Sequence, residues 1–313
     1  MSIKKSNVLE SLPRVLVILG PTASGKTKLA VSLADSLNGE IISADSRQVY
    51  QGMDIGTGKD LGEYKIGRRK IAYHLIDVVS PSNKFDLAKY QGLAFKAIEK
   101  VLKKGKLPIL VGGSGLYLQA VVDNYDLSAA KADDEERSAL EKLSVTEVYE
   151  KINAINPSFA EKINNSDRHN LRRLSRYLQL AEQGPSLPSK LAARYNYLLL
   201  GFKPGKELMR AKIQARLTER LEKEDLAGEV KRLHKEGVSW QRLESFGLEY
   251  KFVAYYLQKK ISYEKMALDL NIAIRQFAKR QLTWFARWEK QGRKIVWLKN
   301  AAGAETEIKQ WLK

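Results

Sequence analysis

The chain has 313 residues, a hydrophobic fraction of 44% and a formal net charge of +18 at neutral pH. Its length is typical of about two domains, and its excess of Lys and Arg favours a polyanionic partner such as nucleic acid, with an ordinary basic enzyme as the alternative. The absence of cysteine excludes disulfides and thiolate metal sites, and the three histidines are too widely spaced to predict a metal site. Because no apolar segment is long enough for a signal peptide or a membrane span, we expect a cytoplasmic protein that does not enter a membrane.

The first part of the chain alternates between strand and helix patterns. Short apolar runs at 14–20, 40–45 and 107–115 are typical of buried parallel strands. Apolar residues at helical spacing occupy 25–37 and 86–104. Since strands that alternate with helices build parallel sheets, we expect an α/β fold with helices flanking the sheet.

The pattern changes after residue 126. Residues 127–190 contain helix and turn patterns and no convincing strand. A strand pattern returns at 195–202, helical patterns follow over 206–290, and a last short strand is predicted at 294–298. We therefore predict a catalytic α/β core, formed by 1–126 and 191–313, that is interrupted by an all-helical domain at 127–190.

Residues 20–27, GPTASGKT, lie between the first predicted strand and the first predicted helix. Gly20 and Gly25 allow the main chain to curl so that several amides point inward, and the helix directs its positive end to the same place. Lys26 adds a positive charge, and the hydroxyl of Thr27 suits Mg²⁺. A chance match in a structural turn is the alternative, but the motif occurs here in the strand–loop–helix context that it requires. The sequence therefore predicts a P-loop NTPase-like fold.

The carboxylate with which a nucleoside triphosphatase holds magnesium is absent from its usual place. The apolar strand at 107–112 runs into Gly112 and Gly113, where such an enzyme has Asp. Asp45 does end a strand, and a carboxylate near bound phosphates is suited to act as a base. A turn residue or a helix cap is the alternative role of Asp45.

Four blocks of sequence occur in an order typical of one enzyme family. They are GPTASGKT (20–27), GEIISADSRQVYQGMDIGTGKD (39–60), LPILVGGSGLYLQA (107–120) and IRQFAKRQLTWFARW (274–288). Together they resemble the tRNA dimethylallyltransferases, also called tRNA isopentenyltransferases, over roughly residues 14–290. The zinc finger of the eukaryotic members is absent, as a chain without cysteine requires, so the resemblance is to the bacterial type.

This resemblance implies transfer of a dimethylallyl group from dimethylallyl diphosphate to N6 of the adenosine on the 3′ side of the tRNA anticodon. Pyrophosphate leaves, Mg²⁺ is required and ATP is not hydrolysed. The implied catalytic residues are Lys26, Asp45 as general base, and Ser114, which stands where the family usually has Thr. For Ser114, a plain glycine-rich connector is the alternative. The implied diphosphate-binding residues are Gly20, Thr22, Ala23, Ser24, Gly25, Lys26, Thr27 and Arg216, and Thr27 is also the implied ligand of Mg²⁺.

The resemblance also implies a set of residues that contact tRNA. They are Asp45, Ser46, Gln48, Ser114, Arg137, Asn170, Arg172, Arg173, Arg176, Lys279, Arg280 and Gln281. Independently, residues 166–183 carry an apolar stripe and a basic stripe at helical spacing. The apolar stripe consists of Leu171, Leu174 and Leu178, and the basic stripe consists of Arg168, Arg172 and Arg176. Such a basic stripe either follows RNA phosphates or is simply a solvated helix face.

Other features leave structural alternatives open. Phe277, Trp284 and Trp288 are spaced as on one helix face and are expected in the core rather than as stacking platforms for bases. The alternative for Arg216 is a surface ion pair with Glu219 on its own helix. Two segments depart from the family pattern: GLEYKF (247–252) replaces a commoner Gly-Tyr-Lys-Glu, so no catalytic role is assigned there, and GTGKD (56–60) replaces Gly-Thr-Ala-Lys-Pro.

Three other functions remain alternatives from the sequence. The first is a P-loop small-molecule kinase, which would carry an Asp-ended magnesium strand. The second is an adenylate isopentenyltransferase acting on free AMP or ATP, which would not need the helical insertion or the positive charge. The third is an RNA-binding module with a vestigial loop, which leaves Lys26, Thr27 and Asp45 unexplained. We expect a monomer.

Overall fold

The computed structural model describes residues 10–127, 143–183, 190–298 and 302–313. The chain forms two compact units. The core unit consists of Met1–Val122 with Ala193–Lys313, and the inserted unit consists of Asp123–Ala192. The boundaries predicted from the sequence, at 126/127 and 190/191, lie a few residues inside these limits.

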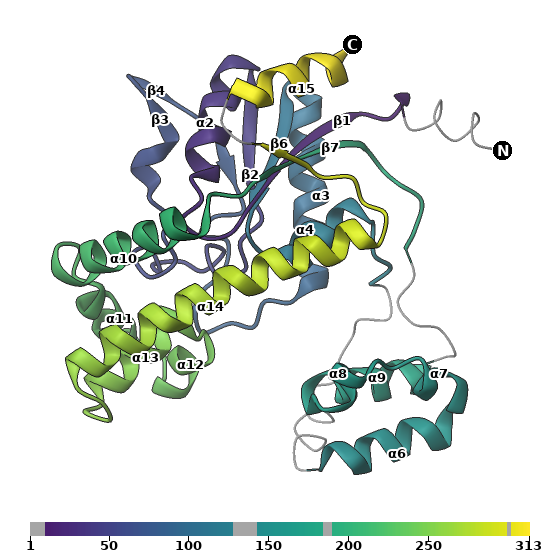
Figure 1. Ribbon diagram of the computed structural model, residues 1–313, viewed down its shortest axis with the longest axis vertical. Coiled ribbons are helices and arrows are strands. Elements are labelled where there is room, and N and C mark those ends of the chain that lie inside the picture. Colours follow the sequence, from purple (N-terminus) through teal and green to yellow (C-terminus); the bar gives the residue numbers. More distant parts are fainter. Residues whose placement is uncertain (1–9, 128–142, 184–189, 299–301) are drawn as a thin grey trace. The chain divides into compact units, whose positions relative to one another are not determined.

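The core unit is built on a six-stranded sheet in which all neighbouring strands are parallel (Figure 1). The strand order is β5-β2-β6-β1-β7-β8. The strands are β1 (Arg14–Leu19), β2 (Gly39–Ser43), β5 (Tyr73–His74), β6 (Leu107–Gly112), β7 (Asn196–Phe202) and β8 (Val296–Leu298). The expected α/β fold and its five predicted strands are confirmed. Strand β5 has only two residues, too few for an apolar pattern, and was not predicted.

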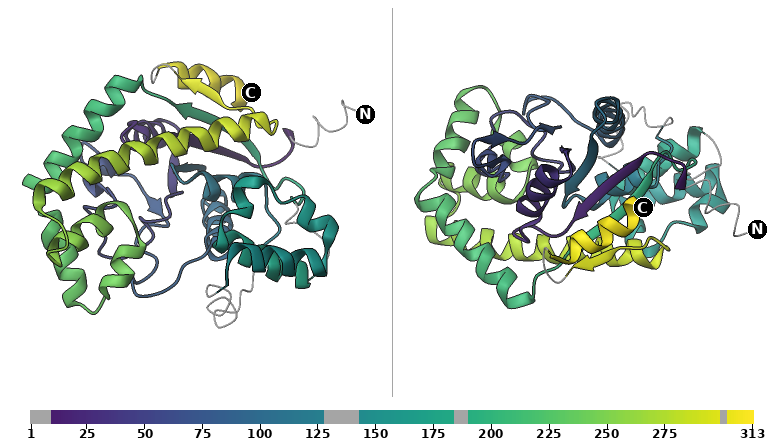
Figure 2. Two further views of the ribbon diagram at one scale, coloured as in Figure 1. Left: turned by 60° about the horizontal axis from the view of Figure 1, so that its bottom comes forward. Right: turned by 90° about the horizontal axis from the view of Figure 1, so that it is seen from above.

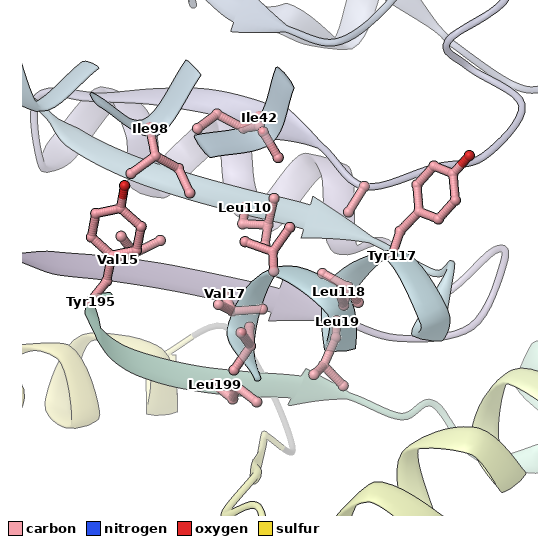
Figure 3. Packing of buried hydrophobic residues seen from close by; sticks show 14 of the residues in the cluster. Val15, Val17, Leu19, Ile42, Ile98, Leu110, Tyr117, Leu118, Tyr195 and Leu199 are labelled. Carbon is pink, nitrogen blue, oxygen red and sulfur yellow. The ribbon is translucent and has the colours of Figure 1, made fainter. Parts of the chain in front are cut away.

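Helices cover both faces of this sheet, so its central strands are mostly apolar. On one face, Val15, Val17 and Leu19 pack against α3 (Leu87–Lys103), α4 (Gly115–Val122) and the end of α14 (Tyr263–Lys290), as Figure 3 shows in part. On the other face, Leu16 and Ile18 pack against α2 (Lys26–Ser36) and α15 (Ala302–Leu312). The strict alternation along β1 follows from the two-residue repeat of a strand.

A second group of helices in the core unit packs beside the sheet. It contains α10 (Lys206–Glu222), α11 (Leu226–Lys235), α12 (Trp240–Ser245) and α13 (Leu248–Leu257), together with the start of α14. Their apolar side chains enclose Val49, Tyr50 and Met53 of the segment that follows β2. Helix α14 therefore contacts α10 and α13 at one end and α4 at the other, and ties this group to the sheet (Figure 2).

Two short strands, β3 (Lys65–Ile66) and β4 (Arg69–Lys70), form a separate antiparallel pair after the short helix η1 (Leu61–Tyr64). Their side chains are exposed, so no buried pattern marks them in the sequence. Among the described residues, no helix is both long and apolar enough to cross a bilayer.

The inserted unit is helical in its described part, with α6 (Val145–Ile155), α7 (Pro157–Glu161), α8 (Asn165–Arg168) and α9 (Leu171–Gln183). Leu174 and Leu178 of the predicted apolar stripe lie in its core, and Leu171 packs against it. The predicted basic stripe is wrong in one respect, because the helix is interrupted between Arg168 and Leu171. Arg168 turns back to donate hydrogen bonds to the carbonyls of Ile163, at 3.0 Å, and of Ala160.

Glu40 of β2 is a buried carboxylate surrounded by positively charged and imidazole donors. Lys104 and Lys106 donate to its Oε1 at 2.9 Å, and His74 Nε2 lies 2.8 Å from Oε2. Burial would raise the pKa of Glu40, but the hydrogen bonds from Lys106, His74 and Lys104 lower it to about 2. The charged form of Glu40 therefore stabilises the fold above its ordinary pKa of 4.5, and this contribution is lost as the pH falls from 4.5 towards 2.

Glu40→Gln should lower the free energy of unfolding at pH 7 by about 2–3 kcal/mol, because it leaves buried donors without their carboxylate. The deficit relative to the wild type should shrink below about pH 4, where the wild type also loses the charge. Urea unfolding at a series of pH values measures both. The exposed ion pair of Glu99 with Arg194 provides the control, Glu99→Gln, which should change stability by less than about 0.5 kcal/mol. An equal loss in both variants at pH 7 would contradict this account of Glu40.

Candidate active site

Three segments meet where parallel strands end at the carboxyl edge of the sheet, the usual position for ligands in such folds. Residues 20–27 follow β1, residues 44–48 follow β2, and residues 113–115 follow β6. They line a pocket that is open to solvent. Its wall includes Thr22, Lys26, Thr27, Asp45, Ser46, Gln48 and Ser114 from these segments, and Arg216, Arg220, Leu248, Glu249, Phe277 and Gln281 from α10, α13 and α14.

The loop at 20–27 has the main-chain geometry of an anion-binding loop. Ala23 and Gly25 have positive φ angles of 59° and 90°, which is uncommon for alanine and marks a locally strained turn. Helix α2 begins at Lys26 without a side-chain cap, so the amides of its first turn keep their hydrogen-bonding capacity. Gly20 cannot be replaced at low cost, since a Cβ there would lie 2.6 Å from the carbonyl oxygen of Phe202 on β7.

Lys26 lies at the junction of this loop and α2. Its Nζ donates to the carbonyl of Pro21 in the same loop at 3.3 Å. Burial lowers the pKa of Lys26 to about 8; Asp45 opposes this shift, and the guanidinium of Arg216 adds to it. Burial therefore destabilises the charged form of the ammonium group, and a phosphate bound nearby would offset this destabilisation.

Asp45 has the turn-stabilising role that the sequence left as one of two alternatives. Its Oδ1 accepts hydrogen bonds from the amides of Arg47, at 2.9 Å, and Gln48, at 3.4 Å, so it does stabilise a turn. Among the residues that the structure describes, no hydrogen bond reaches Oδ2. Because Asp45 also lines the pocket together with Lys26, one carboxylate oxygen fixes the side chain and the other remains available to a ligand.

Ser114 and Ser46 are hydrogen-bonded to each other in the pocket wall. Ser114 Oγ accepts from the amide of Ser46 at 3.0 Å and lies 3.3 Å from Ser46 Oγ. Gln48 has internal partners at both ends of its amide: Oε1 accepts from Ser43 at 3.0 Å, and Nε2 donates to the carbonyl of Gly58 at 3.0 Å. In this structure, therefore, the side chain of Gln48 holds the segment after β2 in place.

Gln281 is the only buried member of the predicted Lys279–Arg280–Gln281 group, since Lys279 and Arg280 are exposed on α14. Its Oε1 accepts from the amide of Thr22 at 2.8 Å, and its Nε2 donates to the carbonyl of Gly113 at 2.9 Å. One side chain from late in the sequence thus joins the phosphate loop to the glycine-rich turn after β6.

The three aromatic residues of α14 have different environments. Trp288 is buried in the core as predicted. Trp284 is partly buried against the same core and donates to Gln119 at 3.0 Å. Phe277 lines the pocket rather than the core, so the prediction was wrong for this residue. Helical spacing showed that the three share a side of the helix, but not that the open pocket lies beside one end of it.

Arg216 makes an ion pair with Asp60 rather than with Glu219, so the alternative proposed for it was wrong. Arg220 and Glu249 are buried beside it in the wall of the pocket and form an ion pair at 3.3 Å. Sequence reasoning missed both residues. The departure of segments 56–60 and 247–252 from the family pattern was the one available signal, because Asp60 and Glu249 lie in these segments.

Glu229 of α11 fixes residues 54–56 through hydrogen bonds to their main-chain amides. Its carboxylate accepts from the amides of Asp54, Ile55 and Gly56 at 2.8, 2.7 and 3.1 Å. The hydroxyl of Tyr250 donates to the same carboxylate at 2.7 Å, and burial together with this carboxylate raises the pKa of Tyr250 well above its ordinary value. This buried set of hydrogen bonds ties residues 54–56 to the helices around α13.

The predicted tRNA-binding residues of the inserted unit lie around the start of α9. Asn170 Oδ1 accepts from the amide of Arg173 at 3.2 Å, and Arg173 forms an ion pair with Asp167. Arg172 is exposed and has no ion pair within the described part of the chain, whereas Arg176 is partly buried. Arg137 lies outside the described residues. The unit therefore presents Arg172 to solvent.

The pocket contains oxygen groups that fit Mg²⁺, namely the hydroxyl of Thr27 and the carboxylate of Asp45. Nowhere in the described ranges do three or more His, Cys, Asp or Glu residues cluster as for a metal held by protein alone.

A loop with anion-binding geometry, a carboxylate and several positively charged side chains thus line one pocket of an α/β protein. The family model described as IPP transferase matches residues 48–288, and the chain belongs to this family. It is 45% identical over 287 residues to tRNA dimethylallyltransferase 1 of Syntrophus aciditrophicus, with 92% of this chain and 94% of that protein covered.

Two further proteins show similarity along nearly the whole chain. Identity with tRNA dimethylallyltransferase 2 of Treponema denticola is 44% over 290 residues, which covers 90% of this chain and 95% of that protein. The crystal structure of the full-length tRNA isopentenylpyrophosphate transferase from Bacillus halodurans has a TM-score of 0.68 and 33% identity, with 96% of each chain covered. The family resemblance read from the sequence is therefore confirmed.

The lowered pKa of Lys26 predicts a pH dependence for anion binding. Lys26 is charged below about pH 8 and becomes neutral above it, so its contribution to binding inorganic pyrophosphate should decrease as the pH rises through 8. The ligand titrates as well, so the measured quantity is the ratio of the Kd of Lys26→Met to that of the wild type, obtained by calorimetry from pH 7 to 9.5. We expect a ratio of roughly 10–100 at pH 7 that falls at higher pH.

Lys28→Met, at an exposed position of α2, is the control. A ratio that stays constant to pH 9.5 would contradict the assignment.

Proposed function

We propose that the protein transfers the dimethylallyl group of dimethylallyl diphosphate to N6 of the adenosine on the 3′ side of the tRNA anticodon and releases pyrophosphate. The observation that carries this proposal is that Lys26 of the phosphate loop and Asp45 line one pocket. This pairing suits a reaction in which a diphosphate leaves while an amine loses a proton. The names of relatives that match nearly the whole chain support the choice of substrates.

At the donor end, the C–O bond between the allylic carbon and the diphosphate breaks, and negative charge accumulates on the departing phosphates. The amides of residues 20–25 and the start of α2 stabilise this charge where it develops. Lys26 and Arg216 add two positive side chains from the pocket wall. Bound Mg²⁺, which we propose is held by the hydroxyl of Thr27 and by phosphate oxygens, supplies further neutralisation of the leaving group.

At the acceptor end, N6 forms a bond to the allylic carbon and loses a proton. Asp45 is the proposed base, because Oδ1 is fixed by two amides and Oδ2 remains available for the proton. The linked hydroxyls of Ser46 and Ser114 lie in the same wall and are suited to hold the adenine edge. The adenosine must leave its stack to enter this pocket, which costs a few kcal/mol and least in a loop.

The proposed RNA contacts outside the pocket are basic. Arg172, Arg173 and Arg176 of the inserted unit, with Arg137, are proposed to bind tRNA phosphates, and Asn170 positions the start of α9. Lys279 and Arg280 extend this set on the core unit. Phosphate contacts supply affinity rather than base choice, which fits the net charge of +18. We further propose that the enzyme acts as a cytoplasmic monomer.

An assay with labelled dimethylallyl diphosphate and Mg²⁺ tests the function. The acceptor is either an anticodon stem-loop RNA or AMP, and ATP turnover is measured in parallel. We expect label in the RNA only. Label in AMP alone would identify an adenylate isopentenyltransferase, and ATP turnover without prenyl transfer would identify a kinase.

Asp45→Asn should reduce turnover by about 10²–10⁴-fold and leave the affinity for stem-loop RNA nearly unchanged, because the amide can still cap the turn but cannot take the proton. Single-turnover rates and RNA binding measured on the same preparation separate the two effects. Asp86→Asn is a matched control, since Asp86 also accepts a main-chain amide, that of Lys89 at 2.8 Å, but lies outside the pocket. Loss of RNA binding with chemistry preserved would refute Asp45 as the base.

Arg172→Ala should weaken RNA binding about equally for different sequences and reduce the slope of log K against log salt by about 0.7–1, as expected for one lost phosphate contact. Filter binding at several salt concentrations measures this slope. Lys309→Ala on α15 removes an exposed charge from the core unit and should leave the slope unchanged. An unchanged slope in Arg172→Ala would indicate a solvated helix face instead.

A further inference from the structure

Arg220 of α10 is a buried arginine whose hydrogen bonds are incomplete. Only 5% of the residue is exposed. Its Nη1 lies 3.3 Å from Glu249, but Nε and Nη2 have no hydrogen-bond partner among the described residues. A buried charged group without partners is costly, so such a group in the wall of a pocket points to a ligand.

The two unpartnered nitrogens of Arg220 lie on the same edge of its guanidinium group. Nε and Nη2 present one edge of the planar guanidinium, with two parallel N–H donors. This edge matches two oxygens of a phosphate or carboxylate and makes short, strong hydrogen bonds to them. Arg220 shares the pocket wall with Lys26 and Thr27 of the phosphate loop, so the anion that fits this place is a phosphate.

A second guanidinium approaches Arg220 at Gly58. A Cβ on residue 58 would lie 2.0 Å from Nη2 of Arg220 and 2.2 Å from Nη2 of Arg216. Only glycine leaves space for both, and its φ angle of 62° also favours glycine. Burial lowers the pKa of Arg220, and the nearby positive charge of Arg216 adds to this shift.

The two segments that depart from the family pattern meet at this residue. Gly58 belongs to 56–60, and Glu249, the ion-pair partner of Arg220, belongs to 247–252. Asp60 of the first segment pairs with Arg216. Residues of both segments therefore surround one pair of arginines.

We propose that Arg220 is a second phosphate-binding arginine of the donor site, which binds the terminal phosphate of the diphosphate together with Arg216. Arg216 exchanges Asp60 for a phosphate oxygen, and this movement uncovers the Nε–Nη2 edge of Arg220, while Glu249 holds the opposite side of the guanidinium. The inference rests on the proposed function, since it assumes that the pocket receives a diphosphate. It assigns to this chain a diphosphate contact that the phosphate loop does not supply.

The test measures binding of inorganic pyrophosphate, at fixed Mg²⁺, by calorimetry. Arg220→Met alone would leave Glu249 buried without a partner, so the comparison is between Glu249→Gln and the double variant Arg220→Met with Glu249→Gln. We expect Glu249→Gln to bind pyrophosphate at least as tightly as the wild type and the double variant to bind it roughly 10–100-fold more weakly. Affinity for stem-loop RNA should be the same in both.

Two further variants keep the test decisive. Arg220→Lys keeps the charge but lacks the planar fork, and should weaken pyrophosphate binding roughly tenfold even if the double variant does not fold. Arg210→Met, on the exposed side of the same helix, should bind as the wild type does.

Equal pyrophosphate affinity in Glu249→Gln and the double variant, or in the wild type and Arg220→Lys, would overturn the role of Arg220 and leave the proposed function intact. Conversely, a wild type that binds pyrophosphate but transfers no prenyl group to RNA would contradict the proposed function and not the anion site. A wild type that binds no pyrophosphate would overturn both.

Discussion

The close approach of main chains at the ends of three parallel strands is the constraint on which the site depends. Strand β1 lies between β6 and β7, and glycines occupy the points where the following segments come nearest to their neighbours. A Cβ on Gly20 would lie 2.6 Å from the carbonyl of Phe202, and a Cβ on Gly112 would lie 2.1 Å from that of Ala44. These contacts admit no side chain. Main-chain packing therefore places the phosphate loop and Asp45 at the same edge of the sheet, without help from interactions between their side chains.

Helices that follow β7, late in the sequence, supply the remaining residues of the pocket wall at this edge of the sheet. Gln281 joins the phosphate loop to the turn after β6, and Glu229 fixes the amides of residues 54–56. Both side chains are buried and use hydrogen bonds that would be costly to leave unmade. Groups that must hold a precise geometry are generally supported by neighbouring hydrogen bonds of this kind. The arginines of α10 then bring positive charge to the pocket wall.

Sequence patterns predicted the sheet and the loop because both are encoded locally. The pattern consists of an apolar run of the length of a strand, a glycine-rich turn and a helix. It can be recognised within about 25 consecutive residues. Partners that are distant in sequence carry no such signal. The bonds of Gln281 to residues near the start of the chain and the ion pair of Arg220 with Glu249 depend on how α10, α13 and α14 pack. Phe277 was assigned to the core for the same reason, since a helical stripe does not say where a pocket opens.

A crystal structure of the protein with Mg²⁺, a non-reactive thio analogue of dimethylallyl diphosphate and an anticodon stem-loop tests the central claim most directly. The account predicts that the phosphates accept hydrogen bonds from the main-chain amides of residues 20–27 and that the carboxylate of Asp45 lies within about 3.2 Å of the adenine N6. Phosphates bound away from this loop, or an Asp45 side chain turned from the adenine, would contradict it.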